Sequence, residues 1–566
     1  MRSNIKIDER RSDILSANGH LLIEGGPGSG KTTIALLKAM RLIDEGKISR
    51  NQKILFLSFA RATVSRVEEQ AAHLLASDHK RKIEVNTYHG FCWSIIRSYG
   101  SHLVPHKQFR LITPPILSSL TSSLTKEERK IFIEKQFIEE GNIAFDLFSK
   151  ITADIFKRSK KICTIYSKAY PIIIVDEFQD TDENEWNLIK QFGKDSTVVA
   201  LADLQQRIFE FRGASITRVP EFKSHFAMTE FNLGKQNNRS SGKDIAQFGD
   251  DLLTGANKGK KYNNVTVSTY IPYQTDPKTQ LRYSILASIK RLNTQLSIKD
   301  WSIAILVKTK AETLQLSTYL TSVNIRHEVI IDPAGPSLSA SLIAKLMEPF
   351  DESKKLFTTI VQLLISHIRG RKEQLTTEDG KICAFLEGYL RTEKTRGSKQ
   401  KQLIDEITKI AQDRQLLIFS GIPEDDWLVV RGLFQSGVSP SLKNVYEDAK
   451  YLRLLNRGAV LREKLAMAWR DNRCYLNAAK AVDEALTQEH FAMTSRKYSG
   501  IYVMNIHKSK GKEFDEVIIW EDAFRSLVYK NVNPSTNDRI LLRVAVTRSR
   551  IHTTILTPKS SPCILL

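Results

Sequence analysis

The sequence predicts an α/β fold of two domains, each built on a parallel β-sheet and each carrying a mainly helical insertion. Residues 20–70 and 170–240 alternate apolar, strand-like runs with loops and helix-like stretches, the pattern of a parallel sheet covered by helices. Strand patterns return at Trp301–Thr309 and within Gly500–Trp520. Most of the sequence between these two segments has the pattern of amphipathic helices. A chain of 566 residues is long enough to give each part its own core.

These patterns divide the chain into four parts, and both α/β domains are discontinuous in sequence. The predicted parts are a first α/β domain at residues 1–87 and 166–240, a helical insertion at residues 88–165, a second α/β domain at residues 241–350 and 496–566, and a second helical insertion at residues 351–495. The chain shows no internal repeat of the kind that indicates a solenoid or a propeller.

The charge balance points to a polyanionic partner. Lysine and arginine number 84 against 63 aspartate and glutamate residues, which gives a net charge of +21. Such an excess favours binding to nucleic acid. The alternative is that the positive charge serves only solubility.

The cysteines and the hydropathy pattern predict a cytoplasmic protein without a membrane partner. The five cysteines are far apart and form no C-x-x-C pair, so neither a disulfide framework nor a zinc cluster is expected. We find no secretory signal and no apolar run of the roughly 18 residues that a membrane span requires. Cys563–Leu566 matches the prenylation pattern C-a-a-X, but no polybasic segment adjoins it, and we interpret the match as chance.

A glycine-rich segment predicts a phosphate-binding loop. Gly25–Thr32 fits the pattern G-x-x-x-x-G-K-[ST], with an apolar strand pattern before it and a helix pattern after it. Glycines allow backbone N–H groups at a helix N-terminus to approach phosphate oxygens. Lys31 would contact the β and γ phosphates, and the Thr32 hydroxyl would ligate Mg²⁺. The alternative is a purely structural glycine-rich turn. The residues predicted to bind nucleotide here are Gly25, Gly26, Pro27, Gly28, Ser29, Gly30, Lys31, Thr32 and Thr33.

A second segment, Val175–Thr181, places three carboxylates directly after a run of β-branched residues. Burying these charges inside a strand would be costly, so they are expected just past the carboxyl end of the strand, where ligands bind in open α/β sheets. Asp176 is predicted to hold Mg²⁺, and Glu177 to act as the general base. Ordinary surface acids are the alternative.

Eight short segments resemble, in the same order, the motifs of the UvrD/Rep-type DNA helicases of superfamily 1. The segments are Gly25–Thr32, Leu55–Thr63, Asn86–Phe91, Val175–Thr181, Ala202–Ala214, Lys235–Ser241, Asn505–Val517 and Leu541–Arg550. The resemblance runs through the whole chain. It implies two RecA-like P-loop domains with parallel sheets, ATP and Mg²⁺ as cofactors, and single-stranded DNA and DNA junctions as partners.

The resemblance also assigns roles to residues that the pattern alone does not. Arg239 and Arg548 resemble the arginine fingers of the family, Gln206 its γ-phosphate sensor, and Glu513 the acid that reaches the ribose. Cations that stabilise charge on the γ phosphate suit this chemistry, and a buried structural salt bridge is the alternative for each arginine. The implied DNA contacts are Phe59, His89, Phe209, Phe211 and His507. Without the resemblance, the aromatic residues would be expected in the hydrophobic core.

Two positions depart from the family pattern, and both concern the nucleotide base. Arg10 stands where the family usually has a glutamine that reads adenine, and Asn238 stands where a tyrosine usually stacks on it. We therefore expect hydrolysis to be kept, with discrimination between ATP and GTP either relaxed or supplied by a contact from Arg10.

The resemblance implies an ATP-driven helicase or translocase that moves 3′ to 5′ on single-stranded DNA and separates duplex, in repair or defence. One alternative is a DNA-dependent ATPase or DNA-end sensor that does not unwind. Another is an ATP-switched subunit that acts on a partner. Compact relatives include the helicase-like subunits of Gabija-type anti-phage systems, which work with a separate nuclease, so a nuclease subunit is a candidate partner.

Overall fold

The computed structural model describes residues 7–566 apart from a set of short segments. These segments are residues 27, 59–60, 105–108, 204–216, 235–241, 274–275, 277, 297–299, 332–333, 351, 372–374, 436, 451–458, 492–497 and 529–534. The chain forms two compact units. The first comprises Met1–Leu103, Ser149–Ile331 and Met493–Leu566, and the second comprises Val104–Phe148 and Asp332–Ala492.

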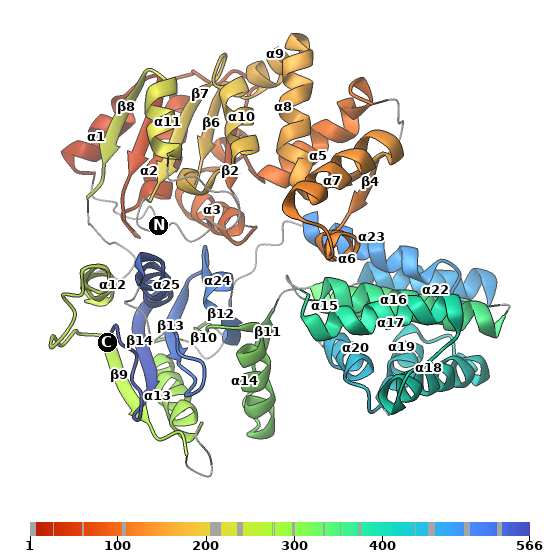
Figure 1. Cartoon of the computed structure of the whole chain (residues 1–566). Helices are drawn as coiled ribbons and strands as arrows, with labels where there is room; N and C mark the ends of the chain where they lie inside the picture. Colours follow the sequence, from red (N-terminus) through yellow and green to blue (C-terminus); the bar gives the residue numbers. More distant parts are fainter. Residues whose placement is uncertain are drawn as a thin grey trace. The chain divides into compact units, whose positions relative to one another are not determined.

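The first unit contains a six-stranded sheet whose strands all run parallel, in the order β3-β2-β6-β7-β1-β8 (Figure 1). Its strands are β1 (His20–Glu24), β2 (Ile54–Ser58), β3 (Ile83–Thr87), β6 (Ile172–Val175), β7 (Thr197–Ala202) and β8 (Met228–Asn232). All four residues of β6 are buried, as expected for an apolar, β-branched strand covered on both faces.

Helices surround this sheet. They are α1 (Glu9–Ser16), α2 (Lys31–Asp44), α3 (Arg61–Leu74), α4 (Ser77–Arg81), α5 (Tyr88–Tyr99), α8 (Phe148–Arg158), α9 (Lys160–Ala169), α10 (Glu183–Phe192) and α11 (Arg218–His225), with 3₁₀ turns η1 (Gly100–His102) and η3 (Phe178–Asp180). One hydrophobic cluster joins Ile23 of β1, Ile34 of α2 and Phe56 of β2, so the loop between β1 and α2 is fixed at both ends by buried side chains.

A second parallel sheet, also in the first unit, has the order β11-β12-β10-β13-β14-β9 (Figure 1). Its strands are β9 (Val265–Tyr270), β10 (Ser302–Val307), β11 (Glu328–Ile330), β12 (Gly500–Asn505), β13 (Phe514–Trp520) and β14 (Ser549–Pro558). The helices of this part are α12 (Ile245–Thr254), α13 (Thr279–Gln295), α14 (Lys310–Ser322), α24 (Ile506–Ser509) and α25 (Thr536–Val546).

Alternating residues of the second sheet feed two separate cores. Ala304 of β10 and Val517 of β13 belong to one cluster, whereas their neighbours Ile305 and Ile518 belong to another. Successive side chains of a strand point to opposite faces, so this sheet is covered on both sides. Two parallel sheets with covering helices confirm the predicted α/β fold with two RecA-like domains.

The second unit is mainly helical. Its helices are α6 (Pro114–Thr121), α7 (Lys126–Glu140), α15 (Ala334–Met347), α16 (Ser353–Gly370), α17 (Thr377–Thr392), α18 (Ser398–Leu416), α19 (Pro423–Gly432), α20 (Pro440–Lys450), α22 (Ala459–Asn472) and α23 (Ala478–Phe491), with the 3₁₀ turn η2 (Phe145–Leu147) and a small sheet of β4 (Arg110–Ile112) and β5 (Asn142–Ala144). Helix α6 packs against α15 and α16, so stretches far apart in sequence share this unit. The predicted boundaries of the four parts stay a prediction. No described helix is long and apolar enough to cross a membrane.

Candidate functional site

The loop between β1 and α2 has the geometry that a phosphate-binding loop requires. Gly28 and Gly30 adopt positive φ angles of 74° and 91°, and α2 begins directly afterwards at Lys31. A Cβ atom on Gly25 would lie 2.5 Å from the Ser29 hydroxyl oxygen and 3.2 Å from Cβ of Leu233, so a larger residue would force these side chains to shift. These glycines therefore allow a tight turn into the N-terminus of a helix.

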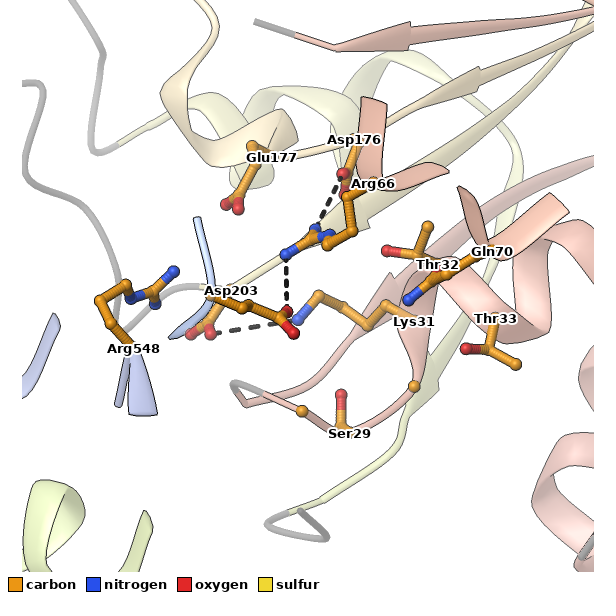
Figure 2. A pocket seen from close by; sticks show the side chains of 13 residues that line it. Ser29, Lys31, Thr32, Thr33, Arg66, Gln70, Asp176, Glu177, Asp203 and Arg548 are labelled. Carbon is orange, nitrogen blue, oxygen red and sulfur yellow. Dashed lines mark hydrogen bonds and ion pairs between the residues drawn. The ribbon is translucent and has the colours of Figure 1, made fainter. Parts of the chain in front are cut away.

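Lys31 reaches back across this loop. Its Nζ donates hydrogen bonds to the carbonyl oxygens of Gly25 at 2.7 Å and Gly26 at 3.2 Å, and lies 4.0 Å from Oδ2 of Asp203 at the end of β7 (Figure 2). The ammonium group is thus held inside the cradle in which phosphate oxygens would sit.

The acidic segment follows β6, at the same edge of the sheet. Asp176 is 2% exposed, and its Oδ2 atom has no hydrogen-bond partner among the described residues. Glu177 takes a left-handed backbone conformation, with φ of 53°, at the start of η3. A buried carboxylate oxygen without a hydrogen bond is costly to the fold. Nη2 of Arg66 lies 4.0 Å from this oxygen, which leaves it able to accept a closer ligand such as a cation.

The pKa values of the two adjacent carboxylates are shifted in opposite directions. Burial, followed by the nearby Glu177 carboxylate, raises the pKa of Asp176 to about 6. Burial alone would also raise the pKa of Glu177, but the Lys510 and Lys31 ammonium groups and a hydrogen bond from Gln179 lower it to about 2. Glu177 is therefore a carboxylate at neutral pH.

Gln179, which sequence analysis did not single out, organises this segment. Its Nε2 donates to Glu177 at 2.6 Å, and its Oε1 accepts from the backbone N–H of Asp203 at 2.9 Å. The side chain is 1% exposed. Gln179 therefore fixes the orientation of Glu177 against the end of the neighbouring strand β7.

Within the first unit, one pocket is lined by residues of both α/β domains (Figure 2). Its lining residues are Gly28, Ser29, Gly30, Lys31, Thr32, Thr33, Arg66, Gln70, Asp176, Glu177, Asp203, Glu513 and Arg548. The first eleven come from the first sheet and its helices, whereas Glu513 precedes β13 and Arg548 precedes β14. The structure thus gathers predicted residues from segments more than half the chain apart.

Arg66 is a pocket residue that the sequence analysis missed. Its Nη1 donates to Glu513 at 3.1 Å, its Nη2 lies 4.0 Å from Asp176, and its buried Nε has no hydrogen-bond partner in the described part of the chain. Gln70 lines the pocket one helical turn further along α3. The i, i+4 spacing of two long polar side chains was the available signal.

The contact of Arg66 bears on the predicted role of Glu513. This carboxylate, expected to reach the ribose, instead pairs with Arg66, and it also lies 3.4 Å from Arg550. The ribose role stays a prediction, and it requires at least one of these pairs to open.

Lys510 joins the second domain to the acidic segment of the first. Its Nζ lies 2.5 Å from Oδ2 of Asp180, and the two side chains are only 6% and 3% exposed. Burial raises the pKa of Asp180 to about 7, although Lys510 opposes this effect. Neither residue was a predicted site residue, because 330 positions separate them and only the fold pairs them.

Arg548, one of the predicted arginine fingers, lies at the pocket in a largely buried position. Its side chain is 2% exposed, and its Nε donates to the carbonyl of Val544 at 2.9 Å. This hydrogen bond to α25, the helix before Arg548, fixes the position of the side chain. Arg548 thus brings a positive charge from the second domain to the pocket.

The other predicted residues are less closely grouped. Arg10 is exposed on α1, with Nη1 near Gly234 at the end of β8. His89 is half-buried on α5, and His507 is exposed on α24. Several predicted residues lie outside the described part of the chain: Pro27, Phe59, Gln206, Phe209, Phe211, Asn238 and Arg239.

Thr32 and Asp176 are the residues that fit a divalent cation. Both line the pocket, and Asp176 offers an oxygen without a hydrogen bond. The described residues contain no group of three or more metal-binding side chains. Mg²⁺ commonly takes only one or two carboxylates, with phosphate oxygens and water completing its shell, so these two residues suit Mg²⁺ bound together with a nucleotide.

The Arg66–Glu513 pair should contribute measurably to stability. We expect a double-mutant cycle with Arg66→Ala and Glu513→Ala, followed by urea unfolding, to give a coupling free energy of about 1 kcal/mol, because both side chains are mostly buried. The exposed pair Arg41–Glu45 is the control, and its coupling is expected to be smaller because solvent screens both charges. Equal coupling in the two cycles would contradict the assignment.

Comparison with known proteins identifies similar chains. Residues 7–138 and 132–227 match the UvrD/REP helicase N-terminal domain. The chain is 21% identical over 374 residues to the ATP-dependent DNA helicase PcrA of Leuconostoc citreum, covering 56% of this chain and 48% of that protein. It is 23% identical over 373 residues to the PcrA of Staphylococcus epidermidis, covering 57% and 50%.

The chain spans about half the length of the curated relatives that it matches. Among solved structures, the crystal structure of Pif1 helicase from Candida albicans matches with a TM-score of 0.29 and 15% identity, covering 56% of this chain and 55% of that one.

Proposed function

We propose that this chain, a UvrD/Rep-type member of superfamily 1, is an ATP-hydrolysing motor that moves on single-stranded DNA and separates duplex. One observation carries the proposal: Lys31, Asp176 and Glu177 of the first domain line the same pocket as Glu513 and Arg548 of the second. A nucleotide in this pocket would touch both domains, so its hydrolysis could change how they are held together.

Each pocket residue would have a distinct role in phosphoryl transfer. Lys31 and the N–H groups at the start of α2 would bind the phosphates, and Thr32 with Asp176 would hold Mg²⁺. When bound, Mg²⁺ would neutralise charge on the phosphate oxygens. The Glu177 carboxylate would orient a water molecule and accept its proton, and Gln179 would keep that carboxylate in place.

Arg548 would stabilise the transition state from the second domain. Negative charge builds on the γ-phosphate oxygens as the bond to the leaving group breaks, and a fixed guanidinium lowers the energy of that state. The buried bond between Arg548 and Val544 supports this role, because it limits the reorganisation required during the reaction.

DNA binding is the second half of the proposal. The net charge of +21 suits a phosphate backbone, and His507 is exposed at the carboxyl end of β12. Alternating grips of the two domains would step the chain along one strand, in the 3′ to 5′ direction that the resemblance implies.

Nucleotide choice offers a separate test. Because Arg10 and Asn238 replace the usual adenine contacts, we expect the wild-type chain to hydrolyse ATP and GTP at similar rates. Turnover of the two nucleotides at matched Mg²⁺ concentrations would measure this, with Arg10→Gln as the comparison. A strict preference for ATP in the wild type would refute relaxed discrimination.

The motor proposal itself is tested by strand displacement. We expect ATP-dependent release of a labelled strand from a duplex with a 3′ single-stranded tail, at a rate that falls steeply as salt rises. Blunt duplex and a 5′-tailed duplex are the controls. Hydrolysis stimulated by single-stranded DNA without strand release would instead indicate an ATPase that translocates or senses DNA ends.

A further inference from the structure

Three neighbouring strands of the second sheet end at the same edge. Strands β12, β10 and β13 are parallel, with Val307 paired to Asn505 and Leu306 paired to Ile519. The segments that follow them carry His507, Lys308 and Phe524. With strands about 4.8 Å apart, the three ends span about 10 Å, the length of about three stacked nucleotides.

The loop after β13 is held rigidly by a buried carboxylate. Glu521 is fully buried; its Oε1 accepts hydrogen bonds from the Ser526 hydroxyl at 2.5 Å and the Leu527 N–H at 3.1 Å, and its Oε2 accepts from the Thr557 hydroxyl at 2.5 Å. Burying a carboxylate is costly unless hydrogen bonds satisfy it. The loop therefore has one well-defined conformation at its base.

Lys308 fixes the same loop from the neighbouring strand. Its Nζ donates to the carbonyl of Ser526 at 2.8 Å, and within the loop the N–H of Phe524 donates to Oδ1 of Asp522 at 2.9 Å. A cation from the end of β10 is thereby held against the base of the loop that follows β13.

This anchored loop displays an aromatic ring to solvent. The side chain of Phe524 is 81% exposed, and it is the only exposed phenylalanine among the described residues. Arg525, next to it, is also exposed. A single exposed apolar residue is ordinary, but here a rigid support, an aromatic face and two cations occur together at one strand edge.

We propose that Phe524 is a base-stacking contact for single-stranded DNA on the second α/β domain, with Arg525 and Lys308 facing the backbone phosphates. The inference rests on the proposed DNA-dependent function and extends it to a residue outside the motifs that predicted it. Aromatic faces with nearby cations give the sequence-tolerant grip that single-stranded DNA requires, because every base offers a π face.

Binding of a fluorescein-labelled oligothymidylate, followed by fluorescence anisotropy, tests the inference. We expect Phe524→Ala and Phe524→Leu each to raise the Kd about tenfold, whereas Phe524→Trp keeps wild-type affinity, because only an aromatic ring stacks on a base. Arg525→Gln should make the slope of log Kd against log salt shallower by about one. Ile418→Ala, which removes a 95% exposed side chain from the second unit, is the control and should bind like the wild type.

The outcomes separate this inference from the function on which it rests. If the wild type binds the oligonucleotide and Phe524→Ala binds it equally well, the stacking contact is wrong while the DNA-binding proposal stands. Retained DNA affinity in Phe524→Leu would also overturn the inference, because the contact would then need only an apolar side chain and not an aromatic ring. A wild type that does not bind would overturn both. Melting curves of the variants, expected to match the wild type, confirm that the fold is kept.

Discussion

Replacing Glu177 by glutamine is expected to slow ATP hydrolysis by about 10²- to 10⁴-fold while leaving ATP and DNA binding intact. The substitution removes the group that would accept the proton from water. It keeps the size of the side chain and an oxygen that can still accept the hydrogen bond from Gln179. Single-turnover hydrolysis, with nucleotide and DNA binding measured separately, would test this expectation.

A surface substitution of the same chemistry provides the control. Glu230→Gln alters an exposed carboxylate on β8 that pairs with Lys223, and its hydrolysis rate should equal that of the wild type. Turnover by Glu177→Gln within a few-fold of the wild type would assign the general base to another group.

Removing Lys510 is expected to destabilise the protein by about 3 kcal/mol, because the buried Asp180 carboxylate would lose its partner. Lys510→Ala should therefore shift the urea unfolding midpoint to a lower concentration. The double substitution Lys510→Met with Asp180→Asn, which removes both charges, should recover most of the loss. No recovery would show that the lysine acts through packing alone.

The loss of stability in Lys510→Ala should also depend on pH and should be larger at higher pH. Burial already raises the pKa of Asp180 to about 7 in the folded chain, and removal of Lys510 should raise this pKa further, since Lys510 opposes the effect. A folded-state pKa above the unfolded value means that stability falls as pH rises between the two. Lys510→Ala should therefore be destabilised more at about pH 8 than at about pH 6.

Local patterns in the sequence were sufficient for the fold class and for the parts of the site that are continuous in the chain. The apolar run ending at Val175 becomes the buried strand β6, and the glycine-rich segment becomes the loop between β1 and α2. Periodicity and glycine spacing determine such features over a few residues, which is why they can be read directly.

The pairings across the site could not be predicted in the same way. Arg66 and Glu513 are 447 positions apart, and Lys510 and Asp180 are 330 apart. Such contacts depend on how two sheets are brought together, and no local pattern encodes this. The joining of residues 104–148 with residues 332–492 in one unit was likewise absent from the sequence analysis.

Arg66 contacts residues at two proposed ligand positions in the pocket. Arg66 lies between Asp176, the proposed Mg²⁺ ligand, and Glu513, the proposed ribose ligand. Arrival of a cation at Asp176 would repel the guanidinium and favour its pairing with Glu513. The two proposed ligand positions are therefore electrostatically linked through one side chain that the family motifs did not indicate.

In the proposed motor, one nucleotide is contacted by both α/β domains, and DNA changes this contact. The most direct test of this coupling is the steady-state rate of ATP hydrolysis by the wild type and by Arg548→Ala, each with and without single-stranded DNA. We predict that DNA accelerates the wild type, and that Arg548→Ala binds ATP normally but hydrolyses it about 10³-fold more slowly in either condition. A wild-type rate that DNA leaves unchanged, together with full activity in Arg548→Ala, would contradict the account.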